Sequence, residues 1–142
     1  MRLAHVTRVI VPIDLVDPQP EAVRTAVEIA GTTAEVHVVY ALPEVEPNLL
    51  AQLDEAHRIR HARESLASWF DDEELSEGLR GHCAVGEPSN VVVDLCRSLD
   101  AHLVVVHSEG RQGVRRFLLG SVAERIARRA PCPVLLLKDP AP

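Results

Sequence analysis

The residues whose types and spacing could support chemistry are concentrated between positions 107 and 121. The glycines in this stretch are Gly110, Gly113 and Gly120, and Ser121 then opens an amphipathic segment. Glycine lets backbone N–H groups approach a phosphate closely, and the first turn of a helix offers N–H groups without a helical partner. Three arginines supply positive charge nearby: Arg111, Arg115 and Arg116. The stretch therefore predicts a phosphate site, and the alternative is a plain loop that ends at an N-cap serine.

Two other groups of polar residues could act chemically. His57 and His61 are four residues apart in a helical segment, a spacing that can hold a divalent metal, but a polar helix face is the plainer interpretation. Ser108 follows His107 directly, and neighbouring residues at a strand end point in opposite directions, so a serine–histidine nucleophile is not expected. The common zinc-protease, P-loop and serine-hydrolase motifs do not occur in the sequence. We therefore expect no enzyme, with at most slow hydrolysis that is incidental to binding.

Composition excludes several classes of function. The chain has 142 residues and a net charge of −6, and this acidic balance argues against a surface for nucleic acid or anionic lipid. Aromatic residues make up 3%, too few to stack on single-stranded nucleic acid, and the apolar runs are too short to span a bilayer. The three cysteines (Cys83, Cys96 and Cys132) are well separated in the sequence and predict buried apolar side chains in a reducing compartment. We expect a cytoplasmic protein without membrane insertion.

Short β-branched runs alternate with longer helical patterns along the chain. Strands are expected at 9–13, 34–42, 79–85, 102–106 and 134–138. Helices are expected at 20–31, 49–70, 89–99 and 121–130. The acidic run 71–74 indicates a solvated helix end, and 107–120 is expected to be a loop. Such alternation predicts one α/β domain over residues 1–142, a parallel sheet covered by helices on both faces, with ligands beyond the carboxyl ends of the strands.

Four stretches carry a resemblance to a known family. Residues 9–14 form an apolar strand with an aspartate at its tip, and Val-Gly-Glu-Pro at 85–88 precedes a helix. Residues 117–126 and 130–138 form the last helix and strand and are the most specific stretches. Together they resemble the universal stress proteins of the adenine-nucleotide α-hydrolase-like group over nearly the whole chain. The resemblance implies a single-domain, Rossmann-like three-layer fold with a five-stranded parallel sheet in the order 3-2-1-4-5, usually dimeric.

The family's nucleotide-binding members carry Gly, two residues, Gly, nine residues and then Gly-Ser or Gly-Thr. Gly110, Gly120 and Ser121 match this spacing, whereas His107 stands where the motif has its first glycine. Strands one and four are neighbours in the implied order, so Asp14 and His107 should lie close together at the cleft. The histidine ring could block the space for a ligand, donate to a phosphate, or form a pH-sensitive pair with the aspartate.

The resemblance implies that ATP, or the related AMP or ADP, binds in this cleft with or without Mg²⁺. Asp14 and the backbone near Ala41 would face the base and ribose. The phosphates would be held by Gly110, Gly120, Ser121 and Val122, and the other expected contacts are Pro12, Ile13, Val106, His107 and Arg111. The expected role is regulatory, in a stress response, with nucleotide changing the affinity for a partner protein or a second copy. The alternative is a nucleotide-free interaction protein of the same fold whose pocket His107 has altered.

The last strand predicts a homodimer. In the order 3-2-1-4-5, residues 134–138 lie at the edge of the sheet, where the unpaired backbone groups of an apolar strand invite another chain. Pairing of this strand with its copy would satisfy those groups in a closed, symmetric contact. The alternative is that the tail 139–142 folds back over the edge, although it contains two prolines.

Overall fold

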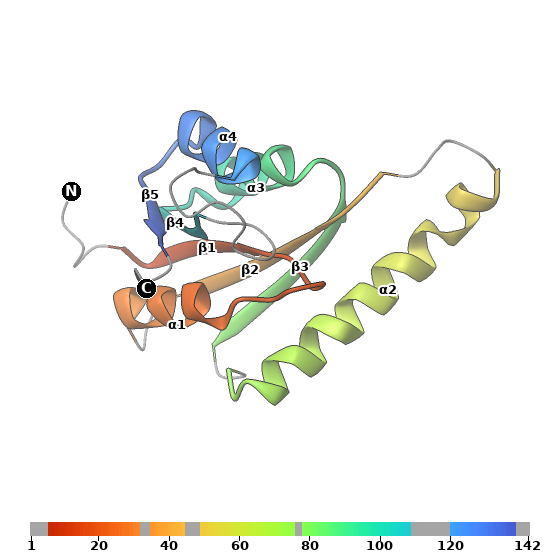
Figure 1. Ribbon diagram of the computed structural model, residues 1–142, viewed down its shortest axis with the longest axis horizontal. Coiled ribbons are helices and arrows are strands. Elements are labelled where there is room, and N and C mark those ends of the chain that lie inside the picture. The colour runs from red at the N-terminus through yellow and green to blue at the C-terminus, as the bar shows by residue number, and fades with distance from the viewer. Residues whose placement is uncertain (1–5, 32–34, 45–48, 76–77, 109–119, 139–142) are drawn as a thin grey trace.

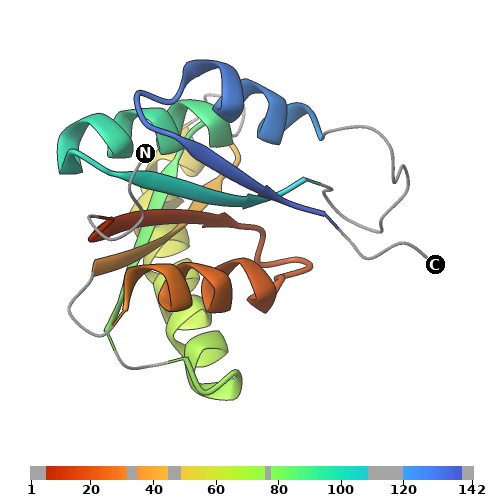
Figure 2. The same cartoon turned by 90° about the vertical axis from the view of Figure 1, so that its left-hand side faces the viewer.

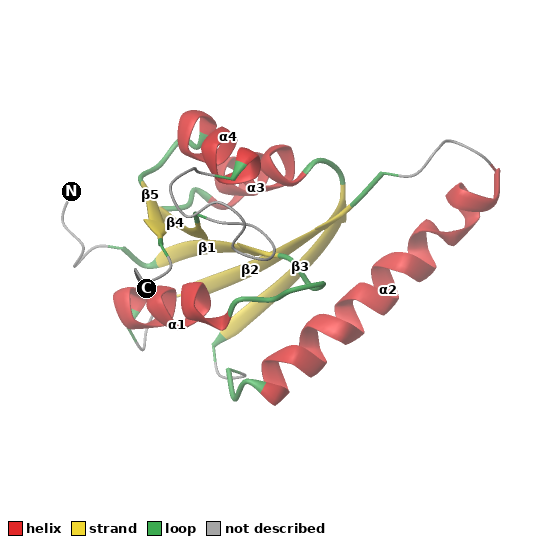
Figure 3. Cartoon of the chain, in the orientation of Figure 1, coloured by secondary structure: helices red, strands yellow, loops and turns green. Residues whose placement is uncertain are grey.

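Strands and helices alternate along the described part of the chain, as the sequence predicts (Figures 1 and 3). The computed structural model describes residues 6–31, 35–44, 49–75, 78–108 and 120–138. The strands are β1 (Arg8–Ile13), β2 (Glu35–Leu42), β3 (Leu79–Val85), β4 (Leu103–His107) and β5 (Val134–Leu137). The helices are α1 (Pro20–Ala30), α2 (Leu49–Asp72), α3 (Pro88–Leu99) and α4 (Ser121–Arg129).

The five strands form one parallel sheet in the order β3-β2-β1-β4-β5, which confirms the predicted order. β1 lies at the centre, where Val9 is opposite Val36 of β2 and Leu103 of β4. Because the strands run in the same direction, their carboxyl ends gather at one edge, the side to which the arrowheads point in Figure 2. The helices α1 and α4 both begin at that edge (Figure 2).

Two apolar clusters hold the helices against the sheet. α1 and α2 cover one face, and α3 and α4 cover the other (Figure 1). Val9, Ile10 and Val11 of β1 alternate between the two clusters and are completely buried, and the run 104–106 of β4 is buried on both faces as predicted. Burial of each such side chain contributes about 1.5–3 kcal/mol relative to exposure. The central strands therefore hold their carboxyl ends in fixed positions.

The turn between β3 and α3 shows why the segment 85–88 folds as it does. Gly86 has a φ of 155°, a conformation that side-chain-bearing residues rarely adopt. Glu87 is the N-cap of α3, and its carboxylate accepts hydrogen bonds from the backbone N–H of Ser89 at 3.1 Å and of Asn90 at 3.0 Å. A glycine for the turn and a carboxylate for the cap thus start the helix within two residues.

Several element boundaries differ from the predicted ones by one or two residues, and two of these differences have a clear physical reason. α3 begins at Pro88, one residue earlier than predicted, because a proline is tolerated at the first helical position, where no N–H donor is required. β4 includes His107, which is opposite Leu137 of β5. The expectation of a loop over 107–120 is therefore wrong at its first residue, because strand pairing continues through the histidine.

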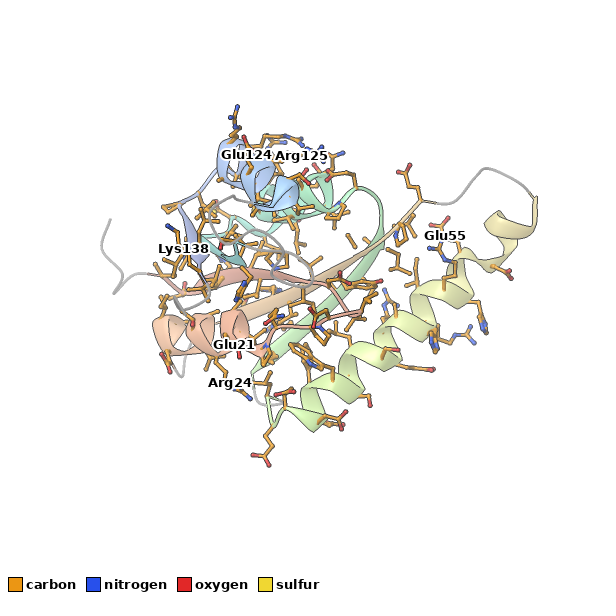
Figure 4. The ribbon with its side chains drawn as sticks, in the orientation of Figure 1. Glu21, Arg24, Glu55, Glu124, Arg125 and Lys138 are labelled. Atoms are coloured by element: carbon orange, nitrogen blue, oxygen red, sulfur yellow. The ribbon has the colours of Figure 1, made fainter. Side chains whose placement is uncertain are left out.

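Charged side chains lie on the outer faces of the helices (Figure 4). Arg24 of α1 donates to Glu73 at 3.0 Å. Glu73 belongs to the acidic run 71–74, which covers the mostly exposed end of α2, as predicted, and the turn that follows it. Arg125 of α4 pairs with Glu87 at 3.3 Å and so links the starts of α3 and α4.

The cysteines differ from their prediction at one position. Cys83 and Cys96 are buried, as expected, but Cys132 is only half-buried. The fold also brings Cys132 against the apolar cluster that contains Cys96. Cys96 and Cys132 are therefore neighbours in the fold although they are far apart in the sequence.

Candidate functional site

A pocket of about 540 Å³ lies at the carboxyl ends of β1, β2 and β4, beside the first turns of α1, α3 and α4. Every predicted binding residue that the structure describes lines this pocket: Pro12, Ile13, Asp14, Ala41, Val106, His107, Gly120, Ser121 and Val122. The predicted residues Gly110 and Arg111 lie outside the described residues. The pocket falls where the strand order reverses beside β1, which is the usual ligand position in an open parallel sheet.

The strand ends and helix starts give the pocket apolar walls. Pro12 and Ile13 come from β1, Val106 from β4 and Ala41 from β2, while Val92 comes from α3. Most of these strands are fixed by the buried residues described above, so the walls are preformed. A concave apolar site with a few polar groups suits a ligand that has a flat ring and a polar end.

Asp14 provides a carboxylate at the tip of β1. Its Oδ1 accepts the backbone N–H of Val16 at 2.9 Å, and this hydrogen bond closes a turn directly after the strand. The turn places Val16, Asp17 and Gln19 in the pocket wall beside Asp14. A carboxylate in this position can accept hydrogen bonds from hydroxyl or amino groups of a ligand.

The start of α4 is fixed by backbone hydrogen bonds. The N–H of Gly120 donates to the carbonyl of Ser108 at 2.7 Å, and the N–H of Ser108 donates to the carbonyl of Leu137 at 2.7 Å. Gly120 is the N-cap, and its carbonyl accepts from Glu124 at 2.9 Å. The alternative prediction that Ser121 caps this helix is wrong, because the serine is the first helical residue.

The glycine N-cap leaves the N-terminus of α4 without a side-chain hydrogen-bond acceptor. The N–H groups of Ser121, Val122 and Ala123 belong to the first turn, so no helical carbonyl lies four residues before them. All three residues line the pocket. The helix start therefore presents backbone donors and partial positive charge at the pocket, an arrangement that attracts anions.

His107 and Asp14 line the same pocket, as the strand order predicts. The histidine is half-buried in the last position of β4. The pocket has a volume of about 540 Å³ with the ring in its wall. Whether the ring contacts a phosphate, pairs with the carboxylate or obstructs a ligand remains a prediction.

Sequence reasoning missed four polar residues of the pocket: Asp17, Gln19, Tyr40 and Ser108. Asp17 and Gln19 lie in the connection between β1 and α1, and Ser108 follows the last residue of β4. Their positions could have identified them, because each lies within a few residues of the carboxyl end of a strand, where ligands bind in a parallel sheet. Tyr40 could have been found in the same way, because it precedes Ala41.

The other candidate chemistry has less structural support. A second pocket of about 340 Å³ lies between the β1–α1 connection and α2, and His61 and Trp69 are among its lining residues. The side chains of His57 and His61 are exposed. Among the described residues, no group of three or more His, Cys, Asp or Glu is placed to hold a metal ion. None of the described helices is long and apolar enough to cross a membrane.

Known sequences provide the first comparison. A family model described as the universal stress protein family matches residues 5–138. A universal stress protein of Methanocaldococcus jannaschii is 30% identical over 149 residues, which cover 94% of this chain and 82% of that protein. Universal stress protein E of Escherichia coli is 28% identical over 150 residues, which cover 92% of this chain but only 46% of that protein. The chain thus spans less than half the length of this second relative.

Solved structures provide the second comparison. Universal stress protein UspA from Lactobacillus plantarum has a TM-score of 0.72 and 20% identity, covering 94% of this chain and 98% of that chain. A universal stress protein in complex with cAMP has a TM-score of 0.61 and 25% identity, covering 94% of this chain and 97% of that chain. The first likeness concerns the fold, and the second adds an adenine nucleotide bound to a protein of similar architecture.

Proposed function

The chain belongs to the universal stress protein family, and from this premise we propose that it binds ATP or a related adenine nucleotide in the pocket at the carboxyl ends of β1 and β4. The observation that carries the proposal is the convergence of the predicted binding residues on one pocket of about 540 Å³. A similar protein has been solved with cAMP, which supports the adenine class of ligand. The expected role is regulatory, with nucleotide changing the affinity for a partner protein.

The two ends of the pocket suit the two ends of a nucleotide. The apolar walls from Ile13, Ala41 and Val106 accommodate a base, with Asp14 placed to accept from ribose hydroxyls. The phosphates would bind at the start of α4, where Ser121 and Val122 present backbone donors. Mg²⁺ would accompany the phosphates as their counterion and needs no protein cluster of its own.

The alternative proposal is a nucleotide-free interaction protein of the same fold. The observation in its favour is His107, which occupies the position of the motif's first glycine and lines the pocket. A side chain there takes space that backbone and ligand would otherwise share. The pocket nevertheless keeps a volume in the range of small-molecule sites with the histidine in its wall, which favours the nucleotide-binding proposal.

We propose binding without efficient turnover. Phosphoryl transfer needs a positioned nucleophile and charge stabilisation at the transferred group. Asp14 engages the turn that follows it, and Ser108 uses its backbone to fix α4 and β5. Neither role prepares a water for attack, so we expect any ATP hydrolysis to be slow.

Retention of nucleotide through purification tests the proposal. Protein purified without added nucleotide should release an adenine nucleotide when it is denatured and its supernatant is chromatographed. Calorimetry of nucleotide-stripped protein with millimolar ATP and Mg²⁺ should show heat of binding. No released nucleotide, no heat and no thermal shift with ATP, ADP or AMP would reject the proposal in favour of the nucleotide-free alternative.

A serine pair provides a matched comparison for the same titration. Ser121→Ala removes a hydroxyl at the pocket, and we expect it to weaken ATP binding severalfold, where tenfold corresponds to ~1.4 kcal/mol. Ser98→Ala removes a hydroxyl from the end of α3, where it donates to the Leu95 carbonyl at 3.2 Å. Ser98 does not line the pocket, so its variant should bind like the wild type.

We also propose a homodimer through β5. The strand lies at the edge of the sheet, and Leu135 is 36% exposed. Leu136 packs against the cluster under α3 and α4, so Leu136→Glu would disturb folding and dimerisation together. Leu135→Glu places the charge on the exposed side of the same strand and should give folded monomer. Light scattering that shows a monomeric wild type at micromolar concentration would reject the dimer.

A further inference from the structure

Cys96 and Cys132 come together in space on the face of the sheet covered by α3 and α4. Cys96 lies in the last turn of α3, and Cys132 lies in the turn that leads from α4 into β5. Both segments lie at the edge from which the strands start, away from the arrowheads in Figure 2. Cys132 packs against the apolar cluster that contains Cys96, and the two thiols are near enough for each to shift the pKa of the other. This pair is therefore remote from the pocket at the carboxyl ends.

The two thiols have different surroundings. Cys96 is 1% exposed, whereas Cys132 is half-buried and lies between Pro131 and Pro133. The hydrogen bond from the partner thiol, reinforced by burial, raises the pKa of Cys96. The same hydrogen bond, opposed by burial, lowers the pKa of Cys132. The accessible sulfur is thus the one that ionises first, and the buried sulfur keeps its proton.

Cys83 is the natural contrast within the chain. It lies on β3 and packs in the other cluster, on the face of the sheet covered by α1 and α2. Burial raises the pKa of its thiol, with a smaller opposing effect of Arg63. The sheet separates Cys83 from the other two cysteines, so it has no thiol partner among them.

We propose that Cys96 and Cys132 are a redox modification site, in which a hydroperoxide oxidises the pair to an intramolecular disulfide and a cellular dithiol reduces it again. The proposal stands on the packing of Cys132 against the cluster that contains Cys96, the access of solvent to Cys132 and the enclosure of Cys96. A buried partner held against the reactive sulfur favours an internal disulfide over a bond to another chain. The site does not depend on nucleotide binding.

The oxidation proceeds in two balanced steps. The Cys132 thiolate attacks one oxygen of hydrogen peroxide, the O–O bond breaks, and the departing hydroxide takes a proton and leaves as water. The resulting sulfenic acid of Cys132 is then attacked by the Cys96 sulfur. The S–O bond breaks, the Cys96 proton leaves with the oxygen, and a second water forms. The two sulfurs have lost two electrons, and one peroxide has been reduced to two waters.

The disulfide would link the end of α3 to the residue that precedes β5 by two positions. It would close the chain between Cys96 and Cys132 in the unfolded state, which lowers the entropy of that state and stabilises the folded protein. β5 is the edge strand, so oxidation also fixes the start of the strand that we propose for dimerisation. The pocket lies at the opposite end of the sheet and should keep its affinity for nucleotide.

Mass spectrometry of the full-length protein tests the site. The wild type is reduced, treated with a stoichiometric excess of hydrogen peroxide, labelled with maleimide under denaturing conditions and compared with an untreated sample. We expect the treated protein to lose two of its three labelled thiols, with a mass decrease of two hydrogen atoms before labelling. Digestion without reductant should yield a peptide in which Cys96 is linked to Cys132, and dithiothreitol should restore all three labels.

Two single variants control the interpretation. Cys83→Ser should still form the disulfide and keep no free thiol after peroxide, because the pair is intact. Cys132→Ser should retain both of its thiols under the same dose. The disulfide-containing wild type should also unfold at a higher urea concentration than the reduced form.

Several outcomes would overturn the proposal. Native protein that keeps three free thiols after peroxide would show that the pair does not oxidise. Oxidation of Cys132 only to the sulfinic acid, or linkage between two chains, would show that Cys96 does not resolve the sulfenic acid. Because these readouts use the wild type, a variant that fails to fold leaves the test intact.

Discussion

The helices α3 and α4 begin at the same edge of the sheet and differ in what closes their N-termini. At α3, the carboxylate of Glu87 accepts from the N–H groups of Ser89 and Asn90 and also contacts the Ser89 hydroxyl. At α4, the N-cap is Gly120, which has no side chain, and the first-turn residues line the pocket. One helix therefore carries its own anion, whereas the other presents its donors to a cavity.

The difference assigns separate roles to two similar segments. Both follow a strand of the parallel sheet, and both have a glycine before the helix. A carboxylate held at a helix N-terminus stabilises the fold, because it satisfies donors and interacts favourably with the helix dipole. A helix N-terminus left open at a pocket attracts an external anion in the same way. A carboxylate added at α4 should therefore raise stability and lower ATP affinity, whereas loss of the carboxylate at α3 should lower stability and leave ATP affinity nearly unchanged.

Gly120→Asp should produce the largest change, because it gives α4 the kind of cap that α3 has. Gly120 has a φ of −60° and a ψ of 149°, which an aspartate at an N-cap adopts without strain. The new carboxylate would accept from the first-turn N–H groups and repel phosphate. We expect ATP affinity to fall by at least tenfold, ~1.4 kcal/mol, in a calorimetric titration, while the free energy of unfolding rises by about 0.3–1 kcal/mol through the new charge at the helix N-terminus.

The matched control is Gly120→Ala. Alanine adds a Cβ without an acceptor or a charge, so it measures the cost of bulk alone at this position. If alanine weakens ATP binding as much as aspartate does, sterics rather than the open helix end govern the site. If neither variant changes the affinity, the phosphates do not bind at the start of α4.

His107→Gly should have the next largest effect and shows which role the histidine plays. Its ring lies in the wall of a pocket that remains open, so we expect it to donate to phosphate and the variant to bind ATP about tenfold more weakly, ~1.4 kcal/mol. Tighter binding would instead identify the ring as an obstruction. An unchanged affinity would contradict both roles. Stability must be measured beside affinity, because a glycine in a strand costs about 0.5–1 kcal/mol.

The sequence predicted the positions of strands better than the contacts of side chains. The β-branched runs of β1 and β4 are buried on both faces, so their pattern alone indicated parallel strands and placed Asp14 and His107 at the same edge. The sheet order came from the family resemblance, because apolar pattern does not determine which strands pair. The identity of the pocket residues followed from that order.

The missed features depend on tertiary contacts between distant segments. β4 continues through His107 because this residue pairs with Leu137, and no local pattern in the sequence predicts that pairing. The contact between Cys96 and Cys132 likewise requires α3 and the turn before β5 to meet. Ser121 was weighed as a cap because serine favours that position, but the backbone bond from Gly120 to Ser108 places the cap one residue earlier.

Glu87→Ala should have a smaller effect and act on stability rather than on affinity. It removes the acceptor at α3, and loss of an N-cap typically costs about 1 kcal/mol. The Glu87 side chain is 34% exposed, so water compensates part of the loss. Urea unfolding should show the decrease, and ATP affinity should change less than in Gly120→Asp. A large loss of ATP affinity would mean that the start of α3 also binds phosphate, and the contrast between the two helices would fail.

The smallest expected effect is the pH dependence of the same cap. Burial would raise the pKa of Glu87, but hydrogen bonds from the Ser89 hydroxyl, the N–H groups of Ser89 and Asn90, and the charge of Arg125 outweigh it and lower the pKa below its ordinary value of 4.5. A carboxyl whose pKa is lower in the folded state stabilises the protein above its unfolded value, and this contribution is lost as pH falls through the folded pKa. The difference in unfolding free energy between wild type and Glu87→Gln should therefore be largest near neutral pH and shrink below about pH 4.5. Gly120→Asp would give α4 an acid-sensitive cap of its own. The unfolding free energy of Gly120→Asp should therefore exceed that of Gly120→Asn near neutral pH, and this difference should shrink over a similar pH range. A difference at α3 that stays constant from about pH 7 to about pH 3 would show that the charge of Glu87 contributes nothing beyond its oxygen atoms, and the comparison would then rest on hydrogen bonding alone.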